Sequence, residues 1–201
     1  MTEVKICGMR RLEDIRYANE LRPDMIGFVF WRPSKRYVST DDASELRSSL
    51  DTGITPVGVF VDEDPRVVAD IANRGIVDMV QLHGVEDEEY IHGLRRLTDA
   101  PIIRTFCVRS EEDLVRASES SADMVLLDNG KGTGQTFDWT LMRDLRRDFI
   151  LSGGLSASNV GDAVRRFHPR AVDVSSAVET DGFKDRSKME QFIDAVRSAR
   201  S

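Results

Sequence analysis

Residues 4–30, VKICGMRRLEDIRYANELRPDMIGFVF, contain a strand–helix–strand pattern. Val4–Cys7 and Met25–Phe30 are apolar runs too short for a helix, and the charged stretch Leu12–Leu21 between them suits an amphipathic helix. Near-continuous apolar runs are typical of strands that are buried on both faces, as in parallel sheets. This stretch therefore predicts two parallel strands joined by a helix.

The same strand-then-helix order repeats along the rest of the chain. Dividing 201 residues by eight gives about 25 residues per unit, enough for a strand, a helix and two short loops. Eight units predict an α/β fold, a compact (β/α)8 TIM barrel that forms a single catalytic domain over residues 1–201. The alternative, an open doubly wound sheet, is disfavoured because no GxGxxG sequence follows the first strand. The other predicted strands are Thr55–Val61, Met79–His83, Ile102–Cys107, Met124–Leu127, Phe149–Ser152 and Ala171–Val174. The other predicted helices are Asp41–Leu50, Pro65–Arg74, Glu86–Leu97, Glu111–Ser120, Trp139–Arg146, Ser158–Phe167 and Asp185–Ala199.

The composition is typical of a globular protein without a membrane span. Hydrophobic residues make up 40% of the chain, charged residues 31%, and no run reaches the ~20 apolar residues that a membrane helix needs. The net charge of -7 argues against a broad nucleic-acid-binding surface, but it leaves room for a local anion site. The N-terminal segment lacks the apolar core of a signal peptide, and Cys7 and Cys107 are too few for a disulfide framework. We therefore expect a cytoplasmic protein with reduced cysteines and no membrane or nucleic-acid partner.

The first strand carries a candidate catalytic thiol. Active sites of (β/α)8 barrels lie at the carboxyl ends of the strands. Side-chain alternation places Lys5 and Cys7 on one face of this strand and Val4 and Ile6 on the other. The apolar pair should face the helices, so Lys5 and Cys7 should point into the barrel. A thiol beside a cation can act as a base, and we expect Lys5 to lower the pKa of Cys7. The alternative is that Cys7 is a small packing residue.

Two further strand ends carry polar residues. Gln81 and His83 share a face of the fourth strand, and Asp128 follows the sixth strand in phase with Leu126. His83 is one of three histidines, and a lone histidine is otherwise more often structural or exposed. The glycine-rich residues 129–136 suit a mobile or tightly turned loop near a ligand, but they lack the P-loop pattern.

The turns after the last two strands suit an anion. Gly153 and Gly154 follow the seventh strand, and Ser175 and Ser176 follow the eighth. In (β/α)8 barrels these two loops recurrently bind phosphate through backbone N–H groups. Glycine lets the backbone approach the anion closely, and serine hydroxyls can donate hydrogen bonds. Such a site would reconcile an acidic chain with an anionic substrate.

In their joint order, these motifs resemble the phosphoribosylanthranilate isomerase family of tryptophan biosynthesis. The resemblance covers essentially the whole chain, and although each motif is weak by itself, the ordered set is highly specific. The motifs are KICG (5–8), GFVF (27–30), SKR (34–36), VGVF (57–60), QLHG (81–84), LD (127–128), GTG (132–134), FDW (137–139), SGGL (152–155) and DVSS (173–176).

The resemblance implies an Amadori rearrangement by general acid–base catalysis, which converts an aminoaldose phosphate into a ketose phosphate. It makes Asp128 the acid that opens the sugar ring and Cys7 the base that removes a carbon-bound proton. It implies substrate contacts at Arg36, His83 and Asp173, with the anthranilate carboxylate at Arg36. It further implies a small-molecule phosphosugar substrate, no cofactor, no metal, and a monomer or homodimer. The residues it assigns to phosphate binding are Gly153, Gly154, Ser175 and Ser176.

Other functions remain open at this point. Another phosphosugar barrel enzyme, such as a sugar-phosphate epimerase or indole-glycerol-phosphate synthase, would need different acid–base groups from Cys7 and Asp128. An isomerase that also accepts a histidine-pathway aminoaldose is chemically closer, and a non-catalytic binding barrel is the third alternative. The chain also departs from the family at Ala177, where glycine is usual. A positive φ there would strain the loop by roughly 1 kcal/mol.

Overall fold

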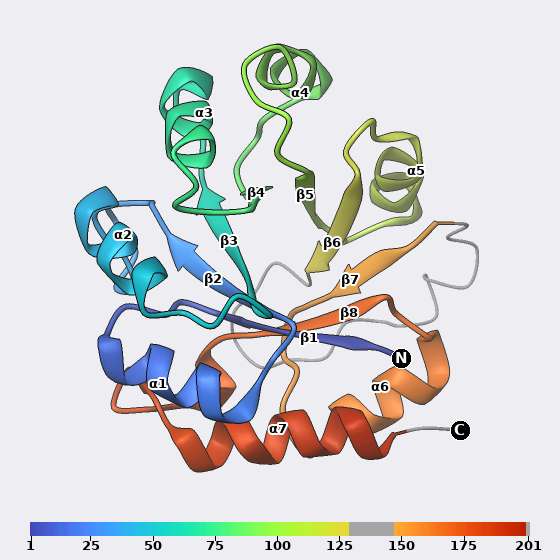
Figure 1. The fold of residues 1–201 in the computed structure, drawn as a ribbon. Coiled ribbons are helices and arrows are strands. Elements are labelled where there is room, and N and C mark those ends of the chain that lie inside the picture. Colours follow the sequence, from blue (N-terminus) through green and yellow to red (C-terminus); the bar gives the residue numbers. More distant parts are fainter. Residues whose placement is uncertain (129–146, 200–201) are drawn as a thin grey trace.

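The computed structural model describes residues 1–128 and 147–199. Within them, eight parallel strands close a barrel in sequence order, and β8 pairs with β1 (Figure 1). The predicted (β/α)8 barrel is confirmed. The strands are β1 (Glu3–Cys7), β2 (Met25–Val29), β3 (Thr55–Phe60), β4 (Met79–Leu82), β5 (Ile102–Cys107), β6 (Met124–Asp128), β7 (Phe149–Leu151) and β8 (Ala171–Val174).

Seven helices in the described part of the chain surround the barrel (Figure 1). The longest, α7, packs against α1 and α6 and so joins the two ends of the helical ring. The predicted helix Trp139–Arg146 and the glycine-rich residues 129–136 lie outside the described residues. The helices are α1 (Leu12–Leu21), α2 (Thr40–Ser48), α3 (Pro65–Asn73), α4 (Glu88–Leu94), α5 (Glu111–Glu119), α6 (Val160–Phe167) and α7 (Arg186–Ser198).

The largest error in the predicted boundaries is at α4, which is shorter at both ends than the predicted Glu86–Leu97. Its first turn begins after Asp87, whose carboxylate accepts the Tyr90 N–H at 2.9 Å and caps the helix. Glu86 lies outside the helix because its carboxylate accepts the backbone N–H groups of Asp62 and Gly84, each at 2.8 Å. The other predicted ends in the described chain differ by no more than two residues.

The barrel interior changes from apolar to polar along the strands. Val4 and Ile6 belong to the core between strands and helices, whereas Lys5 and Cys7 face inward as predicted. A closed apolar layer fills the barrel near the amino ends of the strands. The next layer toward the carboxyl ends is buried but polar, which is costly unless the groups are paired. The apolar layer comprises Met25, Val57, Ile103, Leu126, Ile150 and Ala171. The polar layer comprises Lys5, Gln81, Thr105, Ser152 and Asp173.

A short hairpin after β8 was not predicted. The 3-10 helix η2 (Ser176–Val178) leads into β9 (Glu179–Thr180), which pairs antiparallel with β10 (Phe183–Lys184). Asp181 and Gly182 form the turn with φ values of 52° and 78°. Two adjacent positive φ values fit the tight hairpin turns that favour an Asp-Gly pair.

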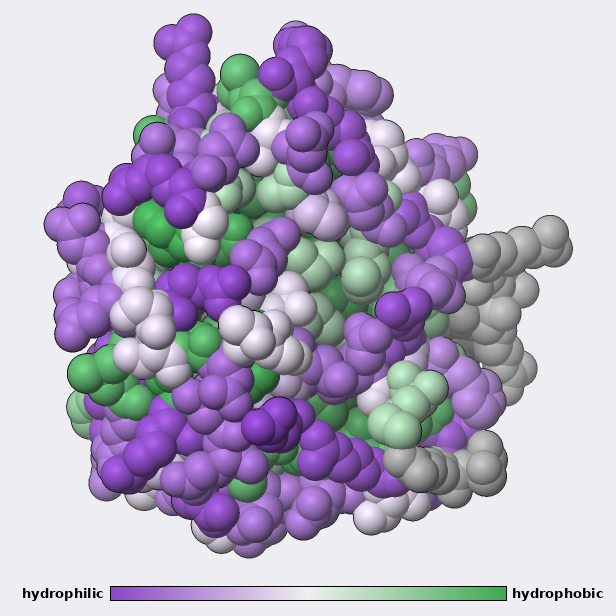
Figure 2. Space-filling model, in the orientation of Figure 1, coloured by the Kyte–Doolittle hydropathy of each residue, from purple (hydrophilic) through white to green (hydrophobic). Residues whose placement is uncertain are grey.

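Figure 2 shows hydrophilic residues over most of the face seen in Figure 1, with hydrophobic residues in patches between them. Within residues 1–128 and 147–199, no helix combines the length and the apolar character needed to span a membrane.

Candidate active site

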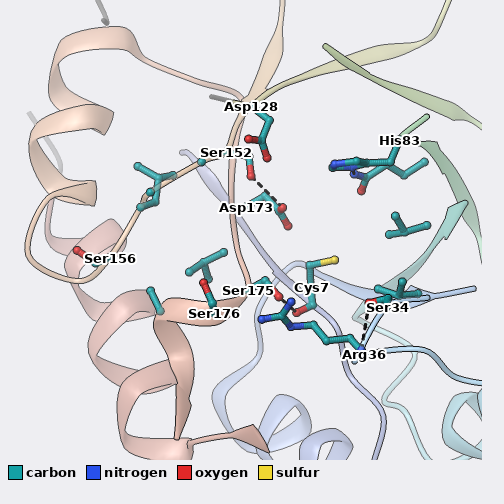
Figure 3. Close-up of a pocket in the computed structure, with 18 of the residues that line it drawn as sticks. Cys7, Ser34, Arg36, His83, Asp128, Ser152, Ser156, Asp173, Ser175 and Ser176 are labelled. Carbon is teal, nitrogen blue, oxygen red and sulfur yellow. Dashed lines mark hydrogen bonds between the residues drawn. The ribbon is translucent and has the colours of Figure 1, made fainter. Parts of the chain in front are cut away.

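A pocket of about 860 Å³ opens at the carboxyl ends of the barrel strands, and every predicted site residue lines it (Figure 3). This volume suits a small-molecule ligand. Cys7 and Asp128 come from the last positions of β1 and β6, and His83 directly follows β4. Asp173 comes from β8, and loops supply the other groups. The lining includes Cys7, Arg36, His83, Asp128, Gly153, Gly154, Asp173, Ser175 and Ser176.

The Cys7 thiol does not have the lowered pKa that the sequence predicts. Burial raises the pKa of Cys7 by more than the Lys5 ammonium lowers it. The Lys5 charge is largely compensated, because its Nζ donates to Asp173 Oδ1 at 2.8 Å, and the Asp173 carboxylate itself raises the pKa of Cys7. The expected lowering of the pKa is therefore wrong, and the thiolate fraction grows only as the pH rises.

Lys5 and Asp173 form an ion pair inside the barrel. Lys5 is completely buried, and Asp173 also accepts a hydrogen bond from Ser152 Oγ at 3.2 Å through its other oxygen (Figure 3). Burial lowers the pKa of Lys5, but the neighbouring Asp173 carboxylate and Cys7 raise it by more, so Lys5 stays charged at neutral pH. Asp173 is thus both a wall of the pocket and the partner of a buried cation.

His83 is open to the pocket and has protein partners on its Nδ1 side. Gln81 Nε2 lies 3.0 Å from this nitrogen and Thr105 Oγ1 lies 3.2 Å from it. The surrounding protein desolvates the ring and lowers the pKa of His83, although Asp128 and Asp173 raise it. His83 therefore presents a neutral imidazole to the pocket.

We expect the His83 ring to titrate below the ordinary value of 6.5 in the folded protein. Because the folded-state pKa lies below the unfolded one, the unfolded chain binds the proton more readily. The contribution of His83 to stability is then complete above pH 6.5 and is lost as the pH falls below it. The ring signals of wild type and His83→Gln in an NMR pH titration check this, and a midpoint above 6.5 contradicts it.

Asp128 ends β6 and projects into the same pocket as Cys7 (Figure 3). Its backbone carbonyl accepts the Val108 N–H at 2.9 Å, which ties the strand end to the chain after β5. The structure therefore brings the predicted acid and the predicted base to one cavity from opposite parts of the barrel wall.

The loop after β7 offers unused backbone donors. Gly153 and Gly154 have φ values of 88° and 70°, which L side chains rarely adopt, so glycine is needed at both positions. Their N–H groups donate to no acceptor within the described residues. Asn159 holds the loop in place, because its amide donates to Gly154 O at 2.9 Å and accepts the Ser156 N–H at 2.8 Å. This arrangement can bind an anion.

The loop after β8 lines the same pocket as the loop after β7. Ser175 Oγ donates to the Cys7 carbonyl at 2.9 Å, so this hydroxyl ties the loop to β1. Ser176 and Ala177 begin the 3-10 helix, and Ala177 does not have a positive φ. Alanine in place of the usual glycine therefore causes no backbone strain at this position.

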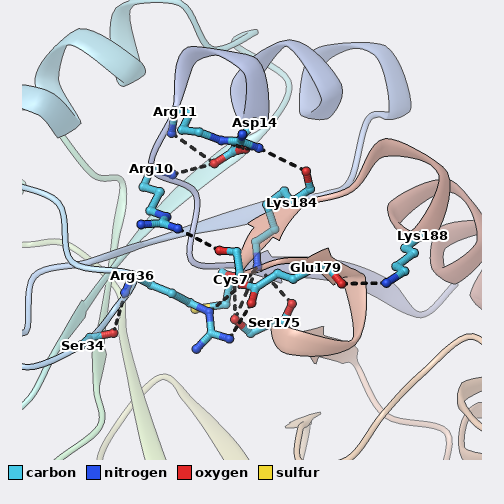
Figure 4. Close-up of polar contacts among 11 residues, drawn as sticks. Cys7, Arg10, Arg11, Asp14, Ser34, Arg36, Ser175, Glu179, Lys184 and Lys188 are labelled. Carbon is cyan, nitrogen blue, oxygen red and sulfur yellow. Dashed lines mark hydrogen bonds and ion pairs between the residues drawn. The ribbon is translucent and has the colours of Figure 1, made fainter.

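Arg36 is held by residues that the sequence analysis did not single out. Glu179 accepts from its Nε at 2.6 Å and from its Nη2 at 2.8 Å, and Lys184 donates to the same carboxylate at 2.8 Å (Figure 4). Burial raises the pKa of Glu179, but hydrogen bonds from Arg36 and Lys184 lower it by more. The Asp181-Gly182 pair is the sequence signal that would have located this hairpin.

A closed eight-stranded barrel can carry a thiol, a carboxylic acid and two loops with free backbone donors at its strand ends. This arrangement is typical of (β/α)8-barrel enzymes. The family model described as "N-(5'phosphoribosyl)anthranilate (PRA) isomerase" matches residues 4–195. A relative named N-(5'-phosphoribosyl)anthranilate isomerase, from Caldanaerobacter subterraneus subsp. tengcongensis, is 46% identical over 204 residues and covers 98% of each chain. The chain belongs to the N-(5'-phosphoribosyl)anthranilate isomerase family and is an isomerase.

Solved structures agree with this assignment. One phosphoribosyl anthranilate isomerase, in complex with reduced 1-(o-carboxyphenylamino)-1-deoxyribulose 5-phosphate, has a TM-score of 0.87 and 38% identity, covering 98% of this chain and 100% of its own. Monomers generated from the dimeric enzyme of Thermotoga maritima give the same TM-score, 0.87, with 38% identity and the same coverage, 98% and 100%.

Proposed function

We propose that this protein catalyses the Amadori rearrangement of N-(5'-phosphoribosyl)anthranilate to the 1-(o-carboxyphenylamino)-1-deoxyribulose 5-phosphate ketose of tryptophan biosynthesis. The observation that carries the proposal is the convergence of Cys7, Asp128 and two loops rich in backbone donors on one pocket. The relative solved with a reduced form of this ketose supports it.

In this proposal, different residues of the pocket bind different parts of the substrate. The substrate phosphate binds the loops at Gly153–Gly154 and Ser175–Ser176, where backbone N–H groups supply the positive potential. The anthranilate carboxylate binds Arg36, whose guanidinium lines the pocket. His83 and Asp173 lie between these ends and contact the ribose. The reacting carbons then lie between Cys7 and Asp128.

The chemistry requires one proton from an acid, the loss of one proton to a base and a final tautomerisation, and it needs no external oxidant. Asp128 protonates the ring oxygen, and the bond from the anomeric carbon to this oxygen breaks with its electrons going to oxygen. The anilino nitrogen lone pair forms a protonated Schiff base. The Cys7 thiolate removes the proton from the next sugar carbon, and that bonding pair forms the enolamine double bond while the nitrogen is neutralised. Tautomerisation of the enolamine moves a proton from oxygen to carbon and gives the ketone, so substrate and product are isomers.

Turnover of freshly prepared substrate tests this function. We expect the fluorescence of phosphoribosylanthranilate to decay at a rate proportional to enzyme concentration, because the aminoaldose is consumed. A parallel assay with the histidine-pathway aminoaldose distinguishes an enzyme with one substrate from the alternative that accepts both. If the substrate fluorescence persists at micromolar enzyme, the proposed function is wrong, and turnover of a sugar phosphate alone would favour an epimerase.

We also propose that residues 1–201 form a single barrel catalytic domain, which acts as a monomer or homodimer in the cytoplasm. The dimeric relative from Thermotoga maritima supports the second of these states. Light scattering coupled to size-exclusion chromatography distinguishes a mass near 22.6 kDa from twice that value.

A further inference from the structure

Within the described residues, the guanidinium of Arg36 forms hydrogen bonds along one edge only. Glu179 takes Nε and Nη2 in a two-point contact, the geometry in which arginine and carboxylate bind most specifically (Figure 4). Arg36 Nη1 bonds no acceptor within residues 1–128 and 147–199. Because Arg36 lines the pocket, the edge formed by Nη1 and the second Nη2 hydrogen is left for a ligand.

A second cation, Lys184, contacts the same Glu179 carboxylate as Arg36. Lys184 is 4% exposed, and its Nζ donates to Glu179 Oε1 at 2.8 Å and to Ser175 O at 3.0 Å. Burial lowers the pKa of Lys184, and Glu179 opposes this shift. With both cations protonated, the group Arg36, Glu179 and Lys184 has one excess positive charge. A carboxylate that bound Arg36 from the pocket would neutralise it.

The path of the Arg36 side chain is set by a glycine. A Cβ at Gly8 would lie 2.4 Å from Arg36 Cδ, and Gly8 has a φ of 89°. The absent side chain therefore lets Arg36 cross the end of β1 on its way to Glu179. The Arg36 N–H also donates to Ser34 Oγ at 3.1 Å, which fixes the loop where the side chain begins.

The hairpin that carries Glu179 is anchored to the loop after β1. The Phe183 ring has the guanidinium carbons of Arg10 and Arg11 each 4.4 Å from its centroid. Arg10 also donates to Gly182 O at 2.8 Å, and Arg11 donates to Lys184 O at 3.2 Å. Glu179 is thus part of a braced element rather than of a free loop end.

We propose that Glu179 is a positioning residue for substrate recognition, because it fixes Arg36 with its free edge toward the aryl carboxylate of the substrate. Lys184 compensates the Glu179 charge, so that the positive charge of Arg36 remains available to that carboxylate. This inference rests on the proposed function, since it needs a substrate that carries a carboxylate at this end of the pocket.

Two ligands that differ in one group test the assignment. The first is the reduced 1-(o-carboxyphenylamino)-1-deoxyribulose 5-phosphate, and the second is the same compound without the ring carboxyl. In Glu179→Gln the two-point contact is lost and Arg36 is free to rotate. We expect calorimetry to show at least ~10-fold weaker binding of the first ligand and unchanged binding of the second. Both ligands carry the phosphate, so any disturbance of the phosphate loops cancels in the ratio of the two affinities.

Lys184→Met is the matched control, because it removes the hairpin ammonium and leaves the Glu179–Arg36 contact in place. We expect it to lower the ratio of affinities by less than Glu179→Gln does, because the contact that orients Arg36 stays in place and only the charge that compensates Glu179 is lost. The double variant Glu179→Gln/Lys184→Met lacks an unpaired buried ammonium and should show the same lost ratio. If Glu179→Gln does not fold, the double variant replaces it in the binding experiment.

The outcomes separate the two hypotheses. If Glu179→Gln weakens the binding of both ligands equally, Glu179 only holds the hairpin in place. If it weakens the binding of neither ligand, Arg36 needs no positioning. Each of these results overturns the inference. If the wild-type protein binds neither ligand, the proposed function itself fails and the inference fails with it. In wild type, the carboxylate-bearing ligand must bind more tightly.

Discussion

The Cys7→Ser variant is expected to lose about a thousandfold in kcat, the typical contribution of a general base, while it still binds the reduced ketose. A serine hydroxyl has nearly the volume of a thiol but does not ionise near neutral pH. The proton on the second sugar carbon therefore has no acceptor. Single-turnover fluorescence decay measures the loss directly, because product release does not enter the observed rate.

The pH dependence of the wild-type rate adds a second readout for Cys7. Burial raises the pKa of Cys7 above its ordinary 9.0, so the thiolate is a minor species at neutral pH. The Cys7 thiolate should therefore contribute a rise with pH to the single-turnover rate, which the need of ring opening for a protonated acid opposes. In Cys7→Ser the residual rate should lack the contribution of the thiolate. Wild-type and Cys7→Ser pH profiles of the same shape would contradict the assignment of Cys7 as the base.

Asp128→Asn is the companion variant for the acid. An amide cannot donate the proton that opens the sugar ring, so a loss of similar size, about 10² to 10⁴, is expected. Circular dichroism and affinity for the reduced ketose serve as controls for folding and binding. If both variants keep near-wild-type single-turnover rates, Cys7 and Asp128 are not the acid–base pair.

Side-chain alternation along the first strand correctly predicted which side chains face the barrel interior, but it did not predict the pKa shift of Cys7. It placed Lys5 and Cys7 inside the barrel, because a strand with two apolar residues on its other face has only one stable orientation. It did not indicate that Asp173, distant in sequence, would pair with Lys5 at 2.8 Å. The sign of the Cys7 pKa shift depended on this long-range contact and on burial, and neither can be determined from the KICG motif alone.

The hairpin was missed for a different reason. Its strands have two residues each, too few to form an apolar period, and one of them carries Lys184, a residue type that is rarely buried. The positioning of Arg36 likewise depends on residues 143 positions apart in the sequence. Strand number and strand ends follow from local patterns, whereas the polar contacts that orient the site follow from barrel closure.

The second large effect is on stability. Asp173→Asn removes the only carboxylate that the described structure bonds to the fully buried Lys5 ammonium. Removing one partner of a buried ion pair lowers the free energy of unfolding by about 3–5 kcal/mol, because the remaining charge is desolvated without compensation. For a chain of this length that lowers the melting temperature by roughly 10 °C. Urea unfolding monitored by tryptophan fluorescence measures the free energy of unfolding.

The double variant Lys5→Met/Asp173→Asn is the control. It removes both charges and keeps a hydrogen-bonding group beside Ser152, so we expect it to recover at least half of the lost free energy, since apolar replacements of buried pairs are often neutral. A double variant that is less stable than Asp173→Asn would show that the cost does not come from an unpaired ammonium.

The alkaline pH dependence distinguishes an ion pair from a simple packing defect. In wild type the pKa of Lys5 is raised above 10.5, so its contribution to stability is complete below that pH and is lost as the pH rises through the folded-state value. In Asp173→Asn, burial acts without the Asp173 carboxylate and lowers the pKa of Lys5 below 10.5. In this variant the unfolded chain then binds the proton more readily than the folded one. The variant should therefore gain stability as the pH rises toward 10.5, whereas wild type gains no stability from Lys5 over the same range. Parallel stability curves for the two proteins between pH 7 and 10 would show that Lys5 is not held charged by Asp173, whereas converging curves are what a buried, carboxylate-dependent ammonium requires.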